Sequence, residues 1–201
     1  MPGLEGVGNI LELADWRRQV SETYARVRAA ADAEVAWEIW RAEKSRLHRS
    51  HPQSPVPPGN RHEPLATFAY DPGWRCLGSF DAVEPSPAAS EPVPLMRVGR
   101  VSFPLHDGGR GSLDVFWPDE YGGGLFIPFG DATNGTSTYG GGRYLLDGAK
   151  GADLGVETGS LVLDFNFAYH PSCVHDERWI CPLAPPSNRL PIAVEAGERL
   201  A

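Results

Sequence analysis

Apolar residues recur at spacings of three and four through residues 11–49, a stretch that contains neither proline nor glycine. The residues at this spacing are Val20, Tyr24, Val27, Ala31, Val35 and Ile39. Such a stripe is typical of a helix with one buried face. We expect one long helix, or two helices with a break near Asp32. The proline-rich segment 51–59 must end it, because proline removes a backbone donor and clashes with a preceding turn.

From residue 65 onward the hydrophobic pattern changes to short runs with β character. The predicted strands are 65–70, 75–80, 93–98, 100–105, 112–117, 124–129, 143–146, 160–167 and 190–195. Alternation of apolar and polar residues is clearest at 113–117, and the glycine-rich segment 107–111 is typical of a hairpin turn. The proline-rich segment 83–94 is expected to be an exposed loop.

The pattern therefore predicts a mainly β protein of the α+β class. No helical crossover separates the predicted strands, so they should pair antiparallel, as a β-sandwich or a distorted barrel. A helical arm at residues 11–50 should precede a β-rich domain at 51–201, and residues 1–10 should be flexible. The apolar face of the arm should pack on the β domain or on a second copy of the chain, which would make a homodimer.

Charge and composition narrow the function classes. The chain carries 18 basic and 26 acidic residues, and this excess of acid disfavours nucleic-acid partners, which need a basic face. No apolar run is long enough to span a membrane, and no signal peptide is visible at the N-terminus. Three cysteines are too few for a disulfide scaffold and suit a reducing compartment. We therefore expect a cytoplasmic protein.

The densest group of chemically versatile side chains lies within twelve residues near the C-terminus. Its members are His170, Cys173, His175 and Cys181. Imidazole and thiolate are ligands for zinc, copper or iron, so these four residues form a candidate metal site. Alternatively, Cys173 is a nucleophile activated by His170 or His175. Two further readings also remain open: both cysteines are buried core residues, or they form a disulfide. His48, His62 and His106 are expected to face solvent.

A second candidate region spans residues 129–145, where short polar residues and glycines precede an arginine. Arg143 is expected to pair with Asp131 or Asp164 in a partly buried site. Alternatively, its planar guanidinium anchors the carboxylate or phosphate of a ligand. The candidate ligand-binding residues are Asp131, Tyr139, Arg143, Asp164 and Asn166.

Several motifs in the chain match a known family. They are Trp40-Arg41-Ala42-Glu43-Lys44, His51-Pro52-Gln53-Ser54-Pro55, Phe129-Gly130-Asp131-Ala132-Thr133, Gly140-Gly141-Gly142-Arg143-Tyr144-Leu145, Leu163-Asp164-Phe165-Asn166, Cys181-Pro182-Leu183 and Asn188-Arg189-Leu190-Pro191. On these motifs the chain resembles the bacterial and archaeal family called domain of unknown function 1684, over about residues 37–198. The resemblance implies no activity. Where that family commonly has Asn-Pro-Pro-Cys, this chain has His170-Pro171-Ser172-Cys173, so the extra imidazole is either an acquired site or drift in a loop.

Three functions follow from these observations. The first is an enzyme for a small organic molecule, with a site that joins the 131–143 turn to the 170–181 loop and Cys173, His170 and His175 as catalytic residues. The second is a non-catalytic module that binds a small ligand, with Arg143 as the anion anchor. The third is a structural or interaction protein that uses the helical arm as its partner surface.

Overall fold

The computed structural model describes residues 10–88, 93–119 and 122–201. The segment expected to be flexible, 1–10, lies outside the described residues except for Ile10, which begins the first helix. Within the described ranges, no helix combines the length and the apolar character needed to cross a lipid bilayer.

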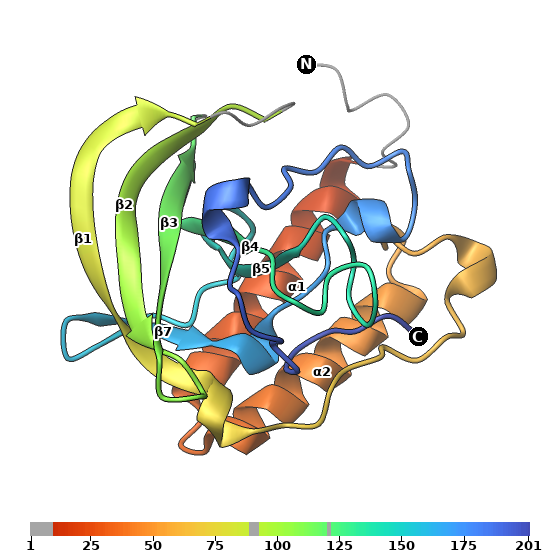
Figure 1. The fold of residues 1–201 in the computed structure, drawn as a ribbon. Coiled ribbons are helices and arrows are strands. Elements are labelled where there is room, and N and C mark those ends of the chain that lie inside the picture. The colour runs from red at the N-terminus through yellow and green to blue at the C-terminus, as the bar shows by residue number, and fades with distance from the viewer. Residues whose placement is uncertain (1–9, 89–92, 120–121) are drawn as a thin grey trace.

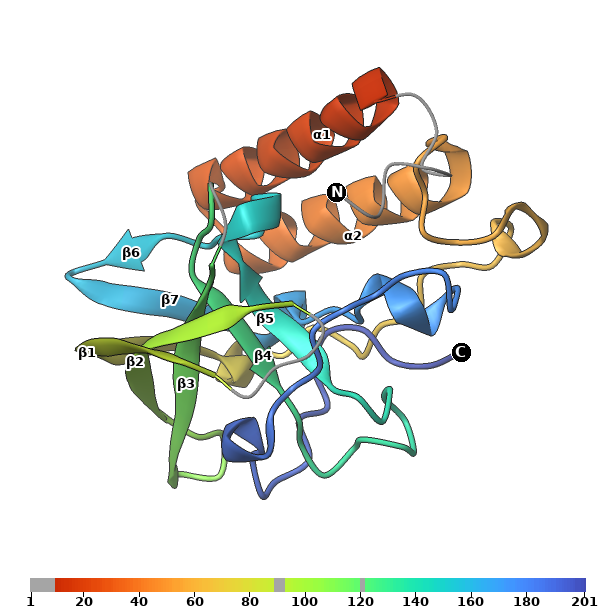
Figure 2. The same ribbon diagram turned by 90° about the horizontal axis from the view of Figure 1, so that it is seen from above.

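Two helices form the arm, and they break where the sequence predicts. Helix α1 (Ile10–Ala29) and helix α2 (Ala33–Ser50) lie side by side along one edge of the molecule (Figure 2). Asp32 caps α2, and its carboxylate Oδ1 accepts a hydrogen bond from the amide of Val35 at 2.9 Å. This cap satisfies one of the amide groups that a helix start leaves without a partner.

The remainder of the chain builds one curled, antiparallel sheet, an open half-barrel (Figure 1). Its strands are β1 (Arg75–Pro87), β2 (Leu95–Pro104), β3 (Arg110–Pro118), β4 (Phe126–Phe129), β5 (Arg143–Asp147), β6 (Val156–Glu157) and β7 (Ser160–Asp164). The strand order is β5-β4-β3-β2-β1-β7-β6. The predicted class, mainly β with an N-terminal helical arm, is confirmed, and so is the hairpin between β2 and β3.

Several predicted strand boundaries were wrong, for identifiable reasons. The predicted strands 93–98 and 100–105 are one strand, β2, with an irregularity between Arg97 and Gly99 that the sequence pattern reads as a break. The proline-rich segment predicted as a loop from 83 is β1 as far as Pro87. On one edge of β1, the pairing with β7 extends only as far as Gly78. Past Gly78 that edge donates no amide hydrogen bonds to β7, so prolines are tolerated there.

Segments 65–70 and 190–195 are not strands. They run along the body in extended form and make isolated contacts, such as the bridge between Thr67 and Glu198. The predicted strand 160–167 ends at Asp164, whose side chain caps a short 3-10 helix by accepting a hydrogen bond from the amide of Asn166 at 3.0 Å. A short polar cap of this kind ends a strand without a change in the hydrophobic pattern of the sequence.

The helical arm packs on the β body, which is one of the two arrangements predicted for its apolar face. A cluster of buried residues joins the two parts: Tyr24, Val27, Ala36, Trp37, Trp40, Ala152 and Phe167. Trp40 is 2% exposed, its ring lies 5.5 Å from that of Phe167, and its indole donates a hydrogen bond to the Tyr24 hydroxyl at 3.1 Å. Trp40 therefore ties both helices to the body.

Trp40→Ala should lower the free energy of unfolding by about 3–5 kcal/mol, because it leaves a cavity where both helices meet the body. Val35→Ala is the matched control on the same helix, since Val35 is 49% exposed and such surface changes usually stay within about 0.5 kcal/mol. Urea denaturation measures both. Equal, small effects in the two variants would show that the arm is not docked through Trp40.

Candidate functional site

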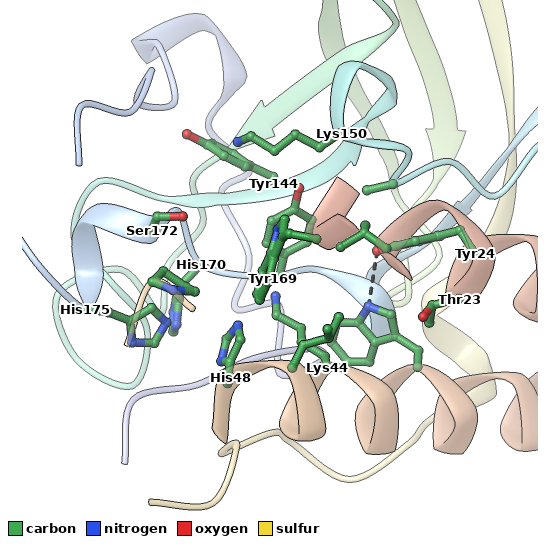
Figure 3. A pocket seen from close by; sticks show the side chains of 16 residues that line it. Thr23, Tyr24, Lys44, His48, Tyr144, Lys150, Tyr169, His170, Ser172 and His175 are labelled. Carbon is green, nitrogen blue, oxygen red and sulfur yellow. Dashed lines mark hydrogen bonds between the residues drawn. The ribbon is translucent and has the colours of Figure 1, made fainter. Parts of the chain in front are cut away.

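A cleft of about 90 Å³ lies between the helical arm and the β body (Figure 3). Aromatic side chains from both parts line it: Trp16, Tyr24, Trp40, Tyr144 and Tyr169. Figure 3 shows Lys44 pointing into the cleft from α2, with three histidines grouped at one end. The cleft thus combines a largely aromatic lining with a few polar groups, which is the usual make-up of a small-molecule site.

A buried ion pair forms one wall of this site. The ammonium nitrogen of Lys44 lies 2.7 Å from Oε1 of Glu198 and 3.9 Å from the centre of the Tyr169 ring. Glu198 is 2% exposed. Although burial opposes ionisation, the ammonium of Lys44 stabilises the carboxylate and lowers the pKa of Glu198 to about 2. Burial lowers the pKa of Lys44, and the charge of Glu198 opposes that effect. The contact joins the arm to the C-terminal segment.

His170 is held in place by the backbone. Its Nε2 accepts a hydrogen bond from the amide of Tyr139 at 3.2 Å, which places the ring proton on Nδ1 in the neutral form. Its own amide donates to Oε2 of Glu198 at 2.7 Å. Burial lowers the pKa of His170 to about 4, so the ring is neutral at pH 7. His170 lines the cleft, and its Nε2 already accepts the hydrogen bond from the amide of Tyr139.

His48 and His175 are free to meet a ligand. Their rings touch edge to face, with centres 5.3 Å apart, and both line the cleft. Among the residues that the structure describes, neither ring nitrogen of these two histidines has a hydrogen-bond partner. Burial lowers the pKa of His48 to about 3 and also lowers that of His175. The cleft therefore presents two neutral imidazoles, each able to accept and to donate a hydrogen bond.

The predicted pairing of Arg143 with Asp131 is confirmed, but the guanidinium is fully rather than partly buried. Its Nη2 lies 3.0 Å from Oδ2 of Asp131 and 2.8 Å from the carbonyl oxygen of Val194. Its Nη1 donates to the carbonyls of Ala196 and Glu198. Arg143 has no exposed surface and does not line the cleft. It holds the segment that carries Glu198.

The other candidate ligand-binding residues also serve the backbone. Oδ1 of Asp131 accepts from the amides of Thr133 at 2.8 Å and Val194 at 3.2 Å. The side chain of Asn166 exchanges hydrogen bonds with the backbone of residue 71. Asp164 is buried and caps the turn that follows β7, and burial raises its pKa. None of these three side chains lines the cleft.

The structure does not bring the predicted metal ligands together. His170 and His175 line the cleft, whereas Cys173 and Cys181 do not. The two thiols are neighbours of each other and of the Tyr139 hydroxyl. In the part of the chain that the structure describes, no three His, Cys, Asp or Glu side chains are placed to hold one ion.

The thiol of Cys173 also lacks the electrostatics of a nucleophile. Burial and the neighbouring Cys181 raise its pKa, whereas catalytic cysteines have a lowered one. All three cysteines, including Cys76, are free, so no disulfide joins Cys173 to Cys181.

Sequence reasoning missed Lys44, His48 and Glu198. His48 was expected to face solvent, yet it is buried against the rings of Trp16 and His175. One signal was available: Lys44 and His48 are four residues apart, so they share a helix face with Trp37 and Trp40. Nothing in the sequence connects that face to Glu198, which lies 150 residues further along the chain.

Comparison with known proteins places the chain among proteins without an assigned function. The family model described as "Protein of unknown function (DUF1684)" matches residues 60–199. An uncharacterized protein of Haloarcula marismortui, solved by NMR in solution, is 36% identical, with 83% of this chain and 94% of that chain covered and a TM-score of 0.62. The search of curated proteins found no match. Lys44 and His48 precede the matched range of the family model.

The buried histidines should make the protein less stable as the pH falls below about 6.5. Their folded pKa values lie below the ordinary 6.5, so below that pH the unfolded chain takes up protons that the folded protein excludes. Each such histidine costs about 1.4 kcal/mol per pH unit until its folded pKa is reached. His48→Gln should reduce this slope by one histidine's share, as measured by urea denaturation between pH 7 and pH 5.

His62→Gln is the control for this experiment, since 74% of the His62 side chain is exposed. It should leave the slope unchanged. A slope in His48→Gln equal to that of the parent protein would contradict the burial of a neutral His48.

Arg143→Lys should destabilise the protein by about 3 kcal/mol or more, because one ammonium cannot replace a planar fork bound to a carboxylate and three carbonyls. Arg26→Lys is the control: its guanidinium pairs with Glu43 and is 56% exposed, so the change should cost less than about 1 kcal/mol. Urea denaturation at pH 7 measures the free energy of unfolding of both variants. Equal effects for the two variants would mean that the fork geometry is unimportant.

Proposed function

The chain belongs to the DUF1684 family, and we propose that it is an enzyme that performs acid–base chemistry on a small organic molecule in the cleft between the helical arm and the β body. The observation that carries the proposal is the contact between His48 and His175 inside an aromatic cleft, with all their ring nitrogens available. Both rings border open space in the cleft, so their nitrogens can reach a ligand bound there.

The lining of the cleft supports a small ligand with a planar, apolar part. Trp16, Tyr24 and Tyr169 offer ring faces and edges for stacking, and such contacts favour flat molecules. A volume of about 90 Å³ accommodates several water molecules or one small organic compound.

His175 is the stronger candidate for the general base. It is less buried than His48, and the negative charge of Glu198 opposes the effect of burial on the pKa of His175. A proton taken from a substrate hydroxyl or from water would therefore be stabilised on His175 by Glu198. His48, with its lower pKa, stays neutral and orients the substrate by a hydrogen bond. Such positioned proton transfer contributes on the order of 100- to 10,000-fold to enzymatic rates.

Three groups considered from the sequence have no part in this proposal. Arg143 is buried, and its Nη1 and Nη2 donate to Asp131 and to backbone carbonyls, so the guanidinium presents no free face to an anion. Cys173 lies outside the cleft lining. No zinc, copper or iron is invoked, because the two available imidazoles have no third ligand beside them in the described ranges.

Hydrolysis of p-nitrophenyl acetate, a small planar ester, tests the proposal. We expect the protein to accelerate release of p-nitrophenol and His175→Gln to reduce kcat/KM at least tenfold, in line with the loss of a general base. His62→Gln, on the exposed surface, is the matched control and should retain the rate.

Equal rates in His175→Gln and the parent protein would overturn the enzymatic proposal. If p-nitrophenyl acetate or its product shifts the NMR signals of His48 and His175 without turnover that depends on His175, the cleft is a binding site and not a catalytic one.

A further inference from the structure

A second cavity, of about 240 Å³, adjoins the histidine end of the cleft. His48, His170 and His175 line both spaces, so the imidazoles stand at their border. The second cavity is walled by the end of α2, the segment 56–66 and the C-terminal segment from Glu198. A molecule that extended past the imidazoles would meet a different environment on each side.

The chemical character of the second cavity differs from that of the aromatic cleft. Among the described residues that line it, the shared imidazoles are the only aromatic side chains, and two are arginines, Arg61 and Arg199. In the described part of the chain, neither arginine lies within ion-pair distance of a carboxylate. Two acidic side chains of the described residues also line the cavity: Glu198, which is paired with Lys44, and Glu63, whose side chain is 60% exposed and lies beside His62.

Arg61 is already oriented. Its Nε donates to the carbonyl oxygen of Val56 at 3.0 Å, and its Nη2 lies 3.5 Å from that of Pro52. These contacts fix the plane of the guanidinium while Nη1 stays without a partner among the described residues. A fixed guanidinium with free donors suits the oxygen atoms of a carboxylate or a phosphate, because less side-chain freedom is lost on binding.

We propose that the substrate is a small aromatic compound that carries an anionic group, with its ring in the aromatic cleft and its carboxylate or phosphate beside Arg61 and Arg199. This inference rests on the proposed function, since it places the bond between ring and anion at the border where His48 and His175 lie. The two arginines then orient the substrate, and His175 meets the atom from which a proton is taken. Arg61 and Arg199 are positioning residues that take no part in the proton transfer.

Binding of 3-phenylpropanoate and of its neutral isostere 3-phenylpropanamide tests the inference. NMR titrations that follow the histidine rings of the full chain report where each compound binds. We expect the acid to shift His48 and His175 and to bind about tenfold more tightly than the amide, which corresponds to one charge-assisted contact. A third probe, 2-phenylethyl phosphate, distinguishes the two anions: the tighter of the two charged compounds identifies the preferred group.

Arg61→Gln should remove the preference for the acid over the amide while leaving the affinity for the amide unchanged. Arg49→Gln is the matched control, because Arg49 is exposed on α2 and lines neither cavity. Equal affinities for acid and amide in the parent protein would overturn the inference, and so would a preference that survives in Arg61→Gln. Absence of binding by all three probes would also overturn it.

These results are separable from the proposed function. The amide reports on the aromatic cleft alone, and the p-nitrophenyl acetate assay uses a neutral ester. Shifts of His48 and His175 by the amide, or turnover that depends on His175, would uphold the catalytic cleft even where the anionic preference fails.

Discussion

The buried guanidinium of Arg143 holds together the parts of the chain on which the candidate site depends. It sits at the start of β5, pairs with Asp131 on the neighbouring turn and donates to the carbonyls of Val194, Ala196 and Glu198. A buried charge of this kind is costly unless it is compensated, and here a carboxylate and three carbonyl dipoles compensate Nη1 and Nη2, while Nε has no partner among the described residues. The C-terminal segment forms no named strand and is tied to the body by isolated bridges, such as that between Thr67 and Glu198, so the contacts of Arg143 reinforce its attachment.

The position of Glu198 follows from that contact. Its carboxylate meets Lys44 from α2 and the amide of His170 from the loop, so three segments far apart in the sequence converge on one acid. The apolar contacts of Trp40 bring the arm to the same place. The ion pair and the aromatic cluster dock the arm on the body, and burial in the cleft formed there lowers the pKa values of His48 and His175. The candidate chemistry is thus a consequence of the docking of the arm.

Local features of the fold were predictable from the sequence, and contacts between distant segments were not. The spacing of Val20, Tyr24 and Val27 predicted the arm, and Asp32 marked its break, because both depend on neighbours along the chain. The irregularity in β2 looks like a strand end in the sequence pattern, whereas the short cap after β7 leaves the hydrophobic pattern unchanged, so both strand boundaries were predicted wrongly. The pair Arg143–Asp131 could be predicted because twelve residues and a glycine-rich turn separate the two side chains.

The site itself could be predicted only in part. The sequence identified His170 and His175 as members of a dense cluster. Their closeness to Cys173 and Cys181 in the sequence predicted a shared ligand, but in the structure the two cysteines do not line the cleft. His48 looked like a solvated residue at the end of a helix, and only the packing of that helix on the body shows that it faces His175. The partners of a buried polar residue depend on tertiary structure, which residue type and spacing do not report.

The protonation of His48 and His175 is the most direct test of this account. An NMR titration of the ring carbons of all six histidines would measure each pKa in the native protein. The account predicts that burial lowers the pKa of His48 to about 3 and the pKa of His175 below the ordinary value of about 6.5, so both rings are neutral at pH 7. A pKa of about 6.5 or higher for both rings would contradict it, because His48 and His175 would then be solvated and the cleft would not hold two imidazoles kept neutral by burial.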